Sequence, residues 1–375
     1  MKENSQVKTP GEYIREELQK RGWTQPDLAK ILARPLPTVN EIIQGKRAIM
    51  PEMAVALGEA FETGAEIWMH REASYRLSLV KEGGTLVRKR ARLFDLAPIK
   101  DMQKRGWIKM TDDVTELESE LCRFFEVGSI DQEPNIVADF KKTMPDEVLT
   151  PLQKVWYFRA KQVASAVQVK QFAEDRLPLC EKELVKLAGF PQEARKVAAV
   201  LSSFGIRFVI VEPLAGSKLD GAAFWLDPVS PVIVLSLRFD RIDAFWFHLG
   251  HEFSHIKNKD SLSIDSNLFG QDKIPSNSKT LIEQRADIES AAMLIPPQQM
   301  ESFVKRVAPM YSKERINQFA NKVKIHPGII VGQLQHRDEI GFHANREMLV
   351  KIRNIVVPSS VTDGWGETIN TKVFE

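Results

Sequence analysis

The chain has 375 residues, of which 43% are hydrophobic, and its formal net charge is +2 at pH 7. This length exceeds one typical domain and can bury a substantial core, so we expect two or three domains. The near-neutral charge says little about nucleic acid by itself, so a prediction of DNA binding must rest on a local motif.

Cysteine usage and hydropathy favour a cytoplasmic protein. Cys122 and Cys180 are far apart in apolar helical patterns, which predicts buried thiols rather than a disulfide or zinc ligands. The polar N-terminus has no secretory signal, and no apolar run approaches the ~20 residues that span a bilayer. We therefore expect no membrane segment.

The first 50 residues carry a helix-turn-helix pattern. Apolar spacing and capping residues predict short helices over 10–20, 24–32 and 37–45, with Ala29, Val39 and Ile42 in a shared core. The third helix would be the recognition helix, with its polar side chains directed outward. The side chains predicted to contact DNA are Gln25, Thr38, Asn40, Glu41, Gln44, Lys46 and Arg47.

A helical bundle used only for protein contact is the alternative for this region. Residues 1–80 contain 11 basic and 11 acidic side chains, so DNA binding would need a polarised face. The segment Tyr13 to Leu77, including Gly45-Lys46-Arg47-Ala48-Ile49, resembles the HigA group of Xre-type antitoxins. That resemblance implies binding of a double-stranded DNA operator as a homodimer. Arg34-Pro35-Leu36-Pro37 replaces the glycine usual in the turn.

A boundary is expected near Gly83 and Gly84, which interrupt the helical pattern. The basic run at 88–92 is more typical of a solvated helix face than of a DNA contact. Helical spacing then continues to about residue 204, with helices predicted over 114–125, 151–172 and 181–204. The predicted domains are a helix-turn-helix domain at 1–80, a helical connector at 81–200 and a third domain at 201–375.

Three strands are predicted over 206–211, 219–226 and 231–236, because β-branched and aromatic runs are separated by turn residues. The strand 219–226, with a central glycine and small residues, is a candidate edge to which an extended peptide could add. A plain core strand is an equally good interpretation of the same segment.

The run from 246 to 255 contains an HExxH motif in an apolar helical pattern. His251 and His255 are one turn apart on a helix, so both rings can reach one metal ion at about 2.0–2.1 Å. Glu252 can then take the proton of a water that the metal acidifies. Chance occurrence is the alternative for so short a motif, but the apolar surroundings favour a buried site.

A second amphipathic helix is predicted over 281–295, ended by Pro296. Glu283 and Asp287 are one turn apart on it. One of them can complete the metal site while the other accepts a hydrogen bond from the free nitrogen of a ligand histidine.

The two segments together resemble the ImmA/IrrE metallo-endopeptidases. The match comprises the lead-in 247–250, His251-Glu252-Phe253-Ser254-His255, Glu283-Gln284-Arg285-Ala286-Asp287 and Leu294-Ile295-Pro296. The resemblance implies Zn²⁺ held by His251, His255 and Glu283, with Glu252 as the catalytic base and Asp287 orienting a ligand. Arg285 stands where the family often has a second acid, and Ser254 replaces a more usual glycine, which slightly crowds the helix crossing.

The predicted fold class is α+β and predominantly helical, with an all-α helix-turn-helix domain, a helical connector and a gluzincin-like metallopeptidase domain with a small three-stranded sheet. The predicted function is a DNA-binding regulator with zinc-dependent endopeptidase activity. Its substrate would be a repressor or antitoxin protein in a stress, prophage or toxin–antitoxin setting. The alternative is a HigA-like antitoxin or repressor whose metallopeptidase-like domain binds a partner or senses a signal without significant proteolysis.

Overall fold

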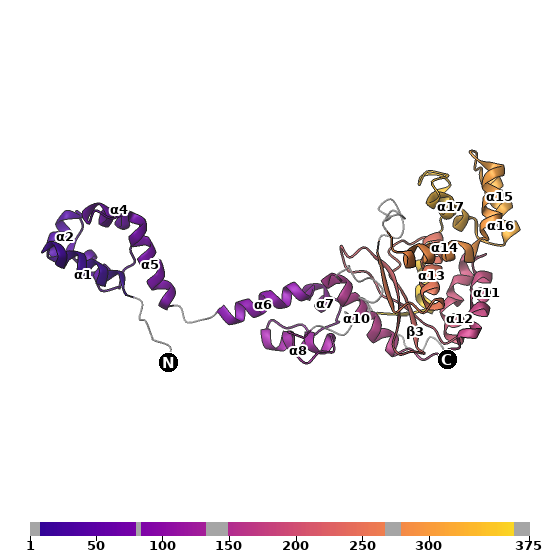
Figure 1. Cartoon of the computed structure of the whole chain (residues 1–375), viewed down its shortest axis with the longest axis horizontal. Helices are drawn as coiled ribbons and strands as arrows, with labels where there is room; N and C mark the ends of the chain where they lie inside the picture. The colour runs from indigo at the N-terminus through magenta and orange to yellow at the C-terminus, as the bar shows by residue number, and fades with distance from the viewer. Residues whose placement is uncertain (1–7, 80–83, 133–148, 267–278, 364–375) are drawn as a thin grey trace. The chain divides into compact units, whose positions relative to one another are not determined.

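The computed structural model describes residues 8–79, 84–132, 149–266 and 279–363 (Figure 1). The chain divides into two compact units, Met1–Lys89 and Arg90–Glu375. Both are rich in helix, and the second also contains a five-stranded sheet. The predicted α+β, predominantly helical class is confirmed, but the sheet has five strands instead of three. No helix in the described ranges is long and apolar enough to cross a membrane.

The first unit is a bundle of short helices around one core. Its helices are α1 (Pro10–Arg21), α2 (Gln25–Ile31), α3 (Leu36–Ile43), α4 (Pro51–Ala60) and α5 (Ala65–Leu79). The predicted core residues Ala29, Val39 and Ile42 are buried in one cluster with Trp68. Thr24 caps α2 through a capping box, which satisfies backbone amides that the first helical turn leaves free. The α2–α3 pair confirms the predicted helix-turn-helix.

The sheet of the second unit combines parallel and antiparallel strands. Its strands are β1 (Arg207–Ile210), β2 (Leu219–Trp225), β3 (Pro231–Leu235), β4 (Leu262–Ser266) and β5 (Val361–Thr362), in the order β4-β2-β3-β1-β5. β2 is antiparallel to both β3 and β4. The interpretation of 219–226 as an edge strand is therefore wrong. One edge of β2 pairs with β3, and β4, which was not predicted, pairs with its other edge.

Helices cover both faces of this sheet, which explains why the strands β1 and β3 carry apolar side chains on both faces. In β3, Val232 and Val234 belong to one core cluster, whereas Ile233 and Leu235 belong to the other. The helix α13 (Ile242–Lys257) packs on the face of Ile233 and beside α14 (Leu281–Leu294), as Figure 1 shows. The described helices within residues 90–165 cover the opposite face, whereas those within 177–203 lie on the same face as α13.

The remaining elements complete the second unit around these layers. Before the sheet lie α6 (Gly84–Leu96), which crosses the division between the units, α7 (Ile99–Lys104), α8 (Val114–Phe124), α10 (Pro151–Ser165), η1 (Glu174–Arg176), α11 (Leu177–Leu187), η2 (Pro191–Lys196) and α12 (Val197–Ser203). After α14 lie α15 (Pro297–Val307), α16 (Lys313–Val323), α17 (Pro327–His336), η4 (Arg346–Met348), α18 (Arg353–Val356) and η5 (Val357–Ser359). The single helix predicted over 181–204 is wrong, because the chain breaks around Pro191 into α11, η2 and α12.

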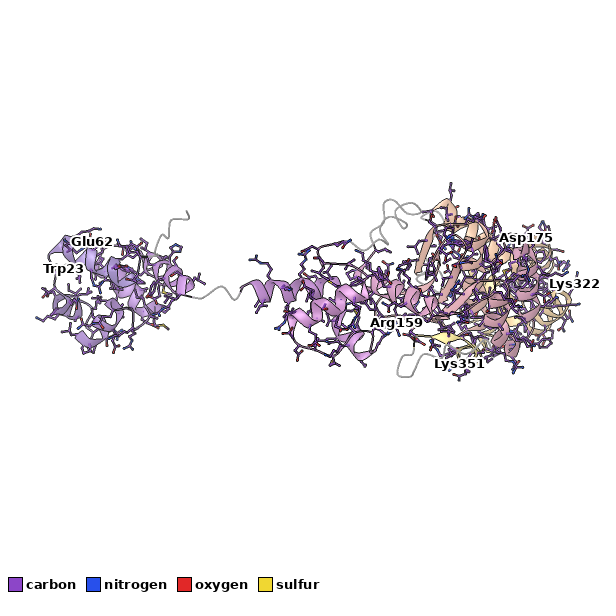
Figure 2. All side chains as sticks on the ribbon, turned by 90° about the horizontal axis from the view of Figure 1, so that it is seen from below. Trp23, Glu62, Arg159, Asp175, Lys322 and Lys351 are labelled. Atoms are coloured by element: carbon purple, nitrogen blue, oxygen red, sulfur yellow. The ribbon has the colours of Figure 1, made fainter. Side chains whose placement is uncertain are left out.

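The segment predicted as a connector shares its core with the sheet. Trp156 on α10 is fully buried, and its Nε1 donates to the backbone oxygen of Val211 at 2.9 Å. Arg159, labelled in Figure 2, lies on the same helix and donates through Nη2 to the backbone oxygen of Asp363 at 2.8 Å. The helix α10 thus packs against the sheet. The three-part division into 1–80, 81–200 and 201–375 stays a prediction about domain organisation.

Candidate metal centre

The HExxH residues lie in the middle of α13 and are completely buried. His251, Glu252 and His255 have no exposed surface, and the two imidazole rings are 4.9 Å apart between centroids. This burial follows from the apolar residues on the other faces of α13, such as Phe245 and Phe253, which form the core against the sheet. The histidine pair therefore lies in an environment from which water is largely excluded.

The helix α14 brings Glu283 to the histidines. Its Oε2 lies 3.1 Å from Nε2 of His251, and its Oε1 lies 3.7 Å from Nε2 of His255. The two helices approach closely at Gly250, where a Cβ atom would lie only 2.7 Å from Oγ of Ser290. Ser290 donates to the backbone oxygen of Phe247 at 2.6 Å, which fixes the crossing. The glycine is therefore needed to bring Glu283 within reach.

Ser254 contributes to the same crossing in a way that the sequence did not reveal. Its hydroxyl donates to Oε2 of Glu289 on α14 at 2.8 Å. The side chain that replaces a glycine thus adds a polar contact between the helices.

A fourth candidate ligand, Asp265 on β4, was missed by the sequence analysis. Its Oδ2 lies 3.4 Å from Nε2 of His251 and 3.9 Å from Nε2 of His255. One potential ligand atom from each of His251, His255, Asp265 and Glu283 lies within 4.8 Å of all the others. Only the pairing of β4 with β2 brings Asp265 here, so no signal around residue 265 alone predicts it.

Each histidine has a carboxylate beside its second ring nitrogen. Oδ1 of Asp287 lies 3.0 Å from Nδ1 of His251, where the sequence analysis expected an orienting acid. Oδ2 of Asp260 lies 2.8 Å from Nδ1 of His255, and Arg285 binds the same oxygen. Asp260 was not predicted, although its position five residues after His255 and just past α13 was a usable signal. Such carboxylates fix the ring orientation and leave Nε2 free for a metal.

Glu252 faces Gly221 of β2. A Cβ atom on that glycine would lie 2.3 Å from Oε1 of Glu252, so only glycine leaves room for the carboxylate. Both oxygens of Glu252 and Nε2 of His255 are buried without a hydrogen-bond partner in the described part of the chain. Unpartnered buried acceptors are costly, so these atoms fit a site that binds a cation and a polar ligand.

Electrostatics point to the same conclusion. Burial opposes the charged form of His251, but Asp265, Asp287 and Glu283 raise its pKa well above its ordinary value. Burial, together with the charge of Asp265, raises the pKa of Glu252 and of Glu283. These four carboxyl groups crowd the two imidazoles in a buried space, and a divalent cation would offset their negative charge.

A cavity of about 240 Å³ adjoins the cluster between α13, α14 and α17. Its walls are mainly apolar and include Phe247, Ile288, Leu294 and Ile329. Asp287 lines the cavity and also lies beside Nδ1 of His251, so the cavity adjoins the acid that neighbours this ring, although none of the four candidate ligands lines it. Its size and apolar lining suit a single side chain or a small apolar group.

The remaining histidines near the site have structural roles. Nδ1 of His326 accepts from the backbone amide of Gly328 at 3.1 Å and caps α17. His248 is buried against the rings of Phe239 and Phe247.

The seven predicted DNA-contacting residues lie on or next to α2 and α3. Gln25, Thr38 and Asn40 are partly buried, whereas the more exposed members are Glu41, Gln44, Lys46 and Arg47. Nη1 of Arg47 lies 3.4 Å from Oε2 of Glu41, so part of its charge is offset within the helix-turn-helix. In the turn between the two helices, Ala33 adopts a left-handed backbone with φ of 50°. The turn thus keeps the backbone conformation that a glycine usually provides.

The comparisons with known proteins match two separate parts of the chain. Residues 202–336 match a family described as the IrrE N-terminal-like domain, Peptidase_M78. This match includes His251, His255 and Glu283, confirms the predicted resemblance, and identifies the segment as a metallopeptidase-like domain.

The N-terminal region is similar to two virulence-associated proteins and to one antitoxin. Virulence-associated protein A of Dichelobacter nodosus is 39% identical over 64 residues, covering 17% of this chain and 63% of the relative. Virulence-associated protein A′ of the same organism is 38% identical over 74 residues, covering 20% and 64%. The chain thus spans slightly under two thirds of these relatives. A solved structure, Pseudomonas aeruginosa antitoxin HigA with higBA promoter, is 37% identical, with a TM-score of 0.19, and the match covers 19% of this chain and 79% of that chain.

Proposed function

We propose that the chain is a DNA-binding regulator whose metallopeptidase-like domain, residues 202–336, is a zinc-dependent endopeptidase. The observation that carries this proposal is the buried cluster of His251, His255 and Glu283 with Glu252 beside it. We further propose a cytoplasmic setting, as the sequence predicts.

The donor set fits zinc. Two imidazole nitrogens and a carboxylate oxygen are the ligands of known catalytic zinc sites, and each histidine has the orienting carboxylate that such sites use. When bound, zinc would polarise a substrate carbonyl and lower the pKa of a water molecule to about 7.

Glu252 would perform the proton transfers of peptide hydrolysis. Its carboxylate is buried and lacks a hydrogen-bond donor among the described residues, so it is available to accept a proton from the attacking water. Burial raises its pKa, which suits a group that must hold a proton and then deliver it to the leaving amine. Gly221 leaves the space that this carboxylate needs.

The substrate would be a protein cleaved at a limited number of positions. The adjoining apolar cavity can hold one side chain of a bound peptide, which would restrict cleavage to few sequences. We propose a repressor, an antitoxin or a cognate toxin as the protein partner, in a stress, prophage or toxin–antitoxin setting.

The first unit would bind a double-stranded DNA operator as a homodimer. In this proposal α3 enters the major groove and presents Gln44, with Thr38, Asn40 and Glu41 nearer its start. Lys46 and Arg47 follow α3 and are exposed, as phosphate contacts require. Gln25 at the start of α2 would contact the backbone beside the groove.

One observation favours a second candidate function, that of a repressor or antitoxin without significant proteolysis. Asp265 gives the cluster four protein donors, and zinc sites closed by four protein ligands are structural rather than catalytic. In that case the domain would bind a partner or sense a signal.

The test combines metal content and cleavage. Full-length wild type should contain about one zinc per chain by mass spectrometry, and the double variant His251→Ala/His255→Ala should contain none. Wild type, or Asp265→Ala, in which the fourth donor of the cluster is removed, should cleave a protein encoded beside it. Glu252→Gln in the same background should retain zinc and lose the product. Glu301→Ala, an exposed acid on α15, is the control and should not change zinc content or cleavage. Zinc without a product in either wild type or Asp265→Ala would favour the second candidate.

A further inference from the structure

The strand β4 places an acidic side chain in the candidate metal centre. It pairs with β2 in antiparallel register, with Asp265 opposite Gly221 and Ile264 opposite Ala222. Leu262 and Ile264 belong to the core on one face of the sheet. Because side chains alternate along a strand, Ser263 and Asp265 face the other side, toward α13.

The donor atoms of the cluster lie close enough together to surround one zinc ion. Four ligand atoms at about 2.0–2.1 Å from a tetrahedral zinc ion lie about 3.3 Å from one another. From Nε2 of His251, the distances are 3.4 Å to Asp265 and 3.1 Å to Glu283. From Nε2 of His255, they are 3.9 Å and 3.7 Å to the same two carboxylates. All four potential ligand atoms lie within 4.8 Å of one another, so they would move closer together around a bound ion.

Ser263 holds both carboxylates in this arrangement. Its hydroxyl donates to Oε1 of Glu283 at 3.0 Å and lies 3.4 Å from both oxygens of Asp265. Asp265 is 5% exposed and Glu283 is 4% exposed, so neither charge is stabilised by bulk water. Since two buried carboxylates this close repel each other, the cluster gains most from a cation that both of them contact.

We infer that Asp265 is a fourth protein ligand of the metal and that β4 thereby holds the peptidase-like domain in a latent state. Catalytic zinc sites keep one coordination position open for water or substrate, whereas four protein ligands close it. The same strand covers the edge of β2, the strand beside Glu252, to which an extended peptide would otherwise add. Release of Asp265 would open the fourth coordination position. This inference rests on the proposed metal site and specifies how its activity is regulated.

The inference is tested by the accessibility of the metal to a small ligand. Full-length wild type and variants are loaded with Co²⁺, which reports its coordination in the visible spectrum, and titrated with acetohydroxamate. We expect no spectral change in wild type and a saturable change in Asp265→Ala, with about one Co²⁺ per chain in both. Asp265→Asn, which keeps the shape of the side chain, should also respond. Asp175→Ala, an exposed acid in η1 that Figure 2 labels, is the matched control and should behave as wild type.

The outcomes separate this inference from the proposed function. A wild-type spectrum that shifts with acetohydroxamate as strongly as that of Asp265→Ala would overturn the closed site and leave the metal centre intact. Unresponsive Asp265 variants that bind Co²⁺ and show the circular dichroism of wild type would overturn the role of Asp265. Failure of wild type to bind Co²⁺ would overturn both the inference and the proposed metal centre.

Discussion

The helix-turn-helix and the metal cluster place their polar side chains in opposite environments. On α3, Val39 and Ile42 are buried in the core while Gln44 and Glu41 are exposed on the other side of the helix. On α13, His251 and Glu252 are themselves completely buried. In the first unit, folding and the proposed recognition therefore use different side chains. In the second, the candidate functional groups are part of the core and oppose folding unless a cation is bound.

The largest effect is expected at Glu252, because the proposed chemistry depends on one buried carboxylate. Glu252→Gln should lower the rate of cleavage about 10²–10⁴-fold, since it removes the group that transfers the proton. Zinc content and operator binding should be unchanged. The rates are compared by gel assay on proteins encoded beside the chain, both in wild type and in an Asp265→Ala background. Equal rates with and without the carboxylate would rule out Glu252 as the base.

Changes at Gln44 and Lys46, just after α3, should affect DNA binding without affecting the fold, because both side chains are exposed. Gln44→Ala should cost about 1–3 kcal/mol of discrimination at one base pair, if Gln44 reads an adenine. Lys46→Ala should instead weaken binding to all DNA sequences about equally. It should also reduce the slope of log K against log salt concentration by about one. Both are measured by fluorescence anisotropy with operator and scrambled duplexes. If neither variant changes DNA affinity, the recognition role of α3 is wrong.

Removing a buried charge should stabilise the metal-free second unit, whereas removing an exposed charge should not. Burial and Asp265 raise the pKa of Glu252 above the value in the unfolded chain, so folding of the wild type is increasingly disfavoured as pH rises above that value. Glu252→Gln should therefore raise the free energy of unfolding at pH 8, by about 1.4 kcal/mol for each unit of pKa difference. The gain should disappear as pH falls toward the usual pKa of glutamate.

The control for this comparison is Glu41→Gln on the exposed side of α3. Its effect on unfolding should stay within about 0.5 kcal/mol at either pH, as is usual for surface positions. Denaturant titrations of chelator-treated protein measure both variants. A lower free energy of unfolding for Glu252→Gln than for wild type at pH 8 would show that the charge of Glu252 does not destabilise the metal-free fold.

The smallest effect is expected in the turn of the helix-turn-helix. Ala33 has φ of 50°, a conformation that costs a residue with a Cβ atom roughly 1–2 kcal/mol. Ala33→Gly should therefore stabilise the first unit by about 1 kcal/mol or less, because glycine also gains entropy in the unfolded chain. Thermal melts followed by circular dichroism test it, and a lower melting temperature would contradict this account of the turn.

The sequence predicted the parts of the fold that depend on local patterns. The periodicity around His251 and Glu283 located α13 and α14, and the runs at 206–211, 219–226 and 231–236 located β1, β2 and β3. It did not predict β4, because Leu262–Ser266 is a short strand whose pairing with β2 is not local. Asp265 was missed for that reason. The packing of α10 on the sheet was also missed, since it depends on contacts between distant segments such as Trp156 and Val211.

The central claim is that the buried cluster of α13, α14 and β4 binds one metal ion. Its most direct test is the metal content of the full-length chain, purified without chelator and measured by inductively coupled plasma mass spectrometry. The account predicts about one zinc per chain in wild type and none in His251→Ala/His255→Ala. A folded wild-type chain that contains no metal, and takes up none from added zinc, would contradict it.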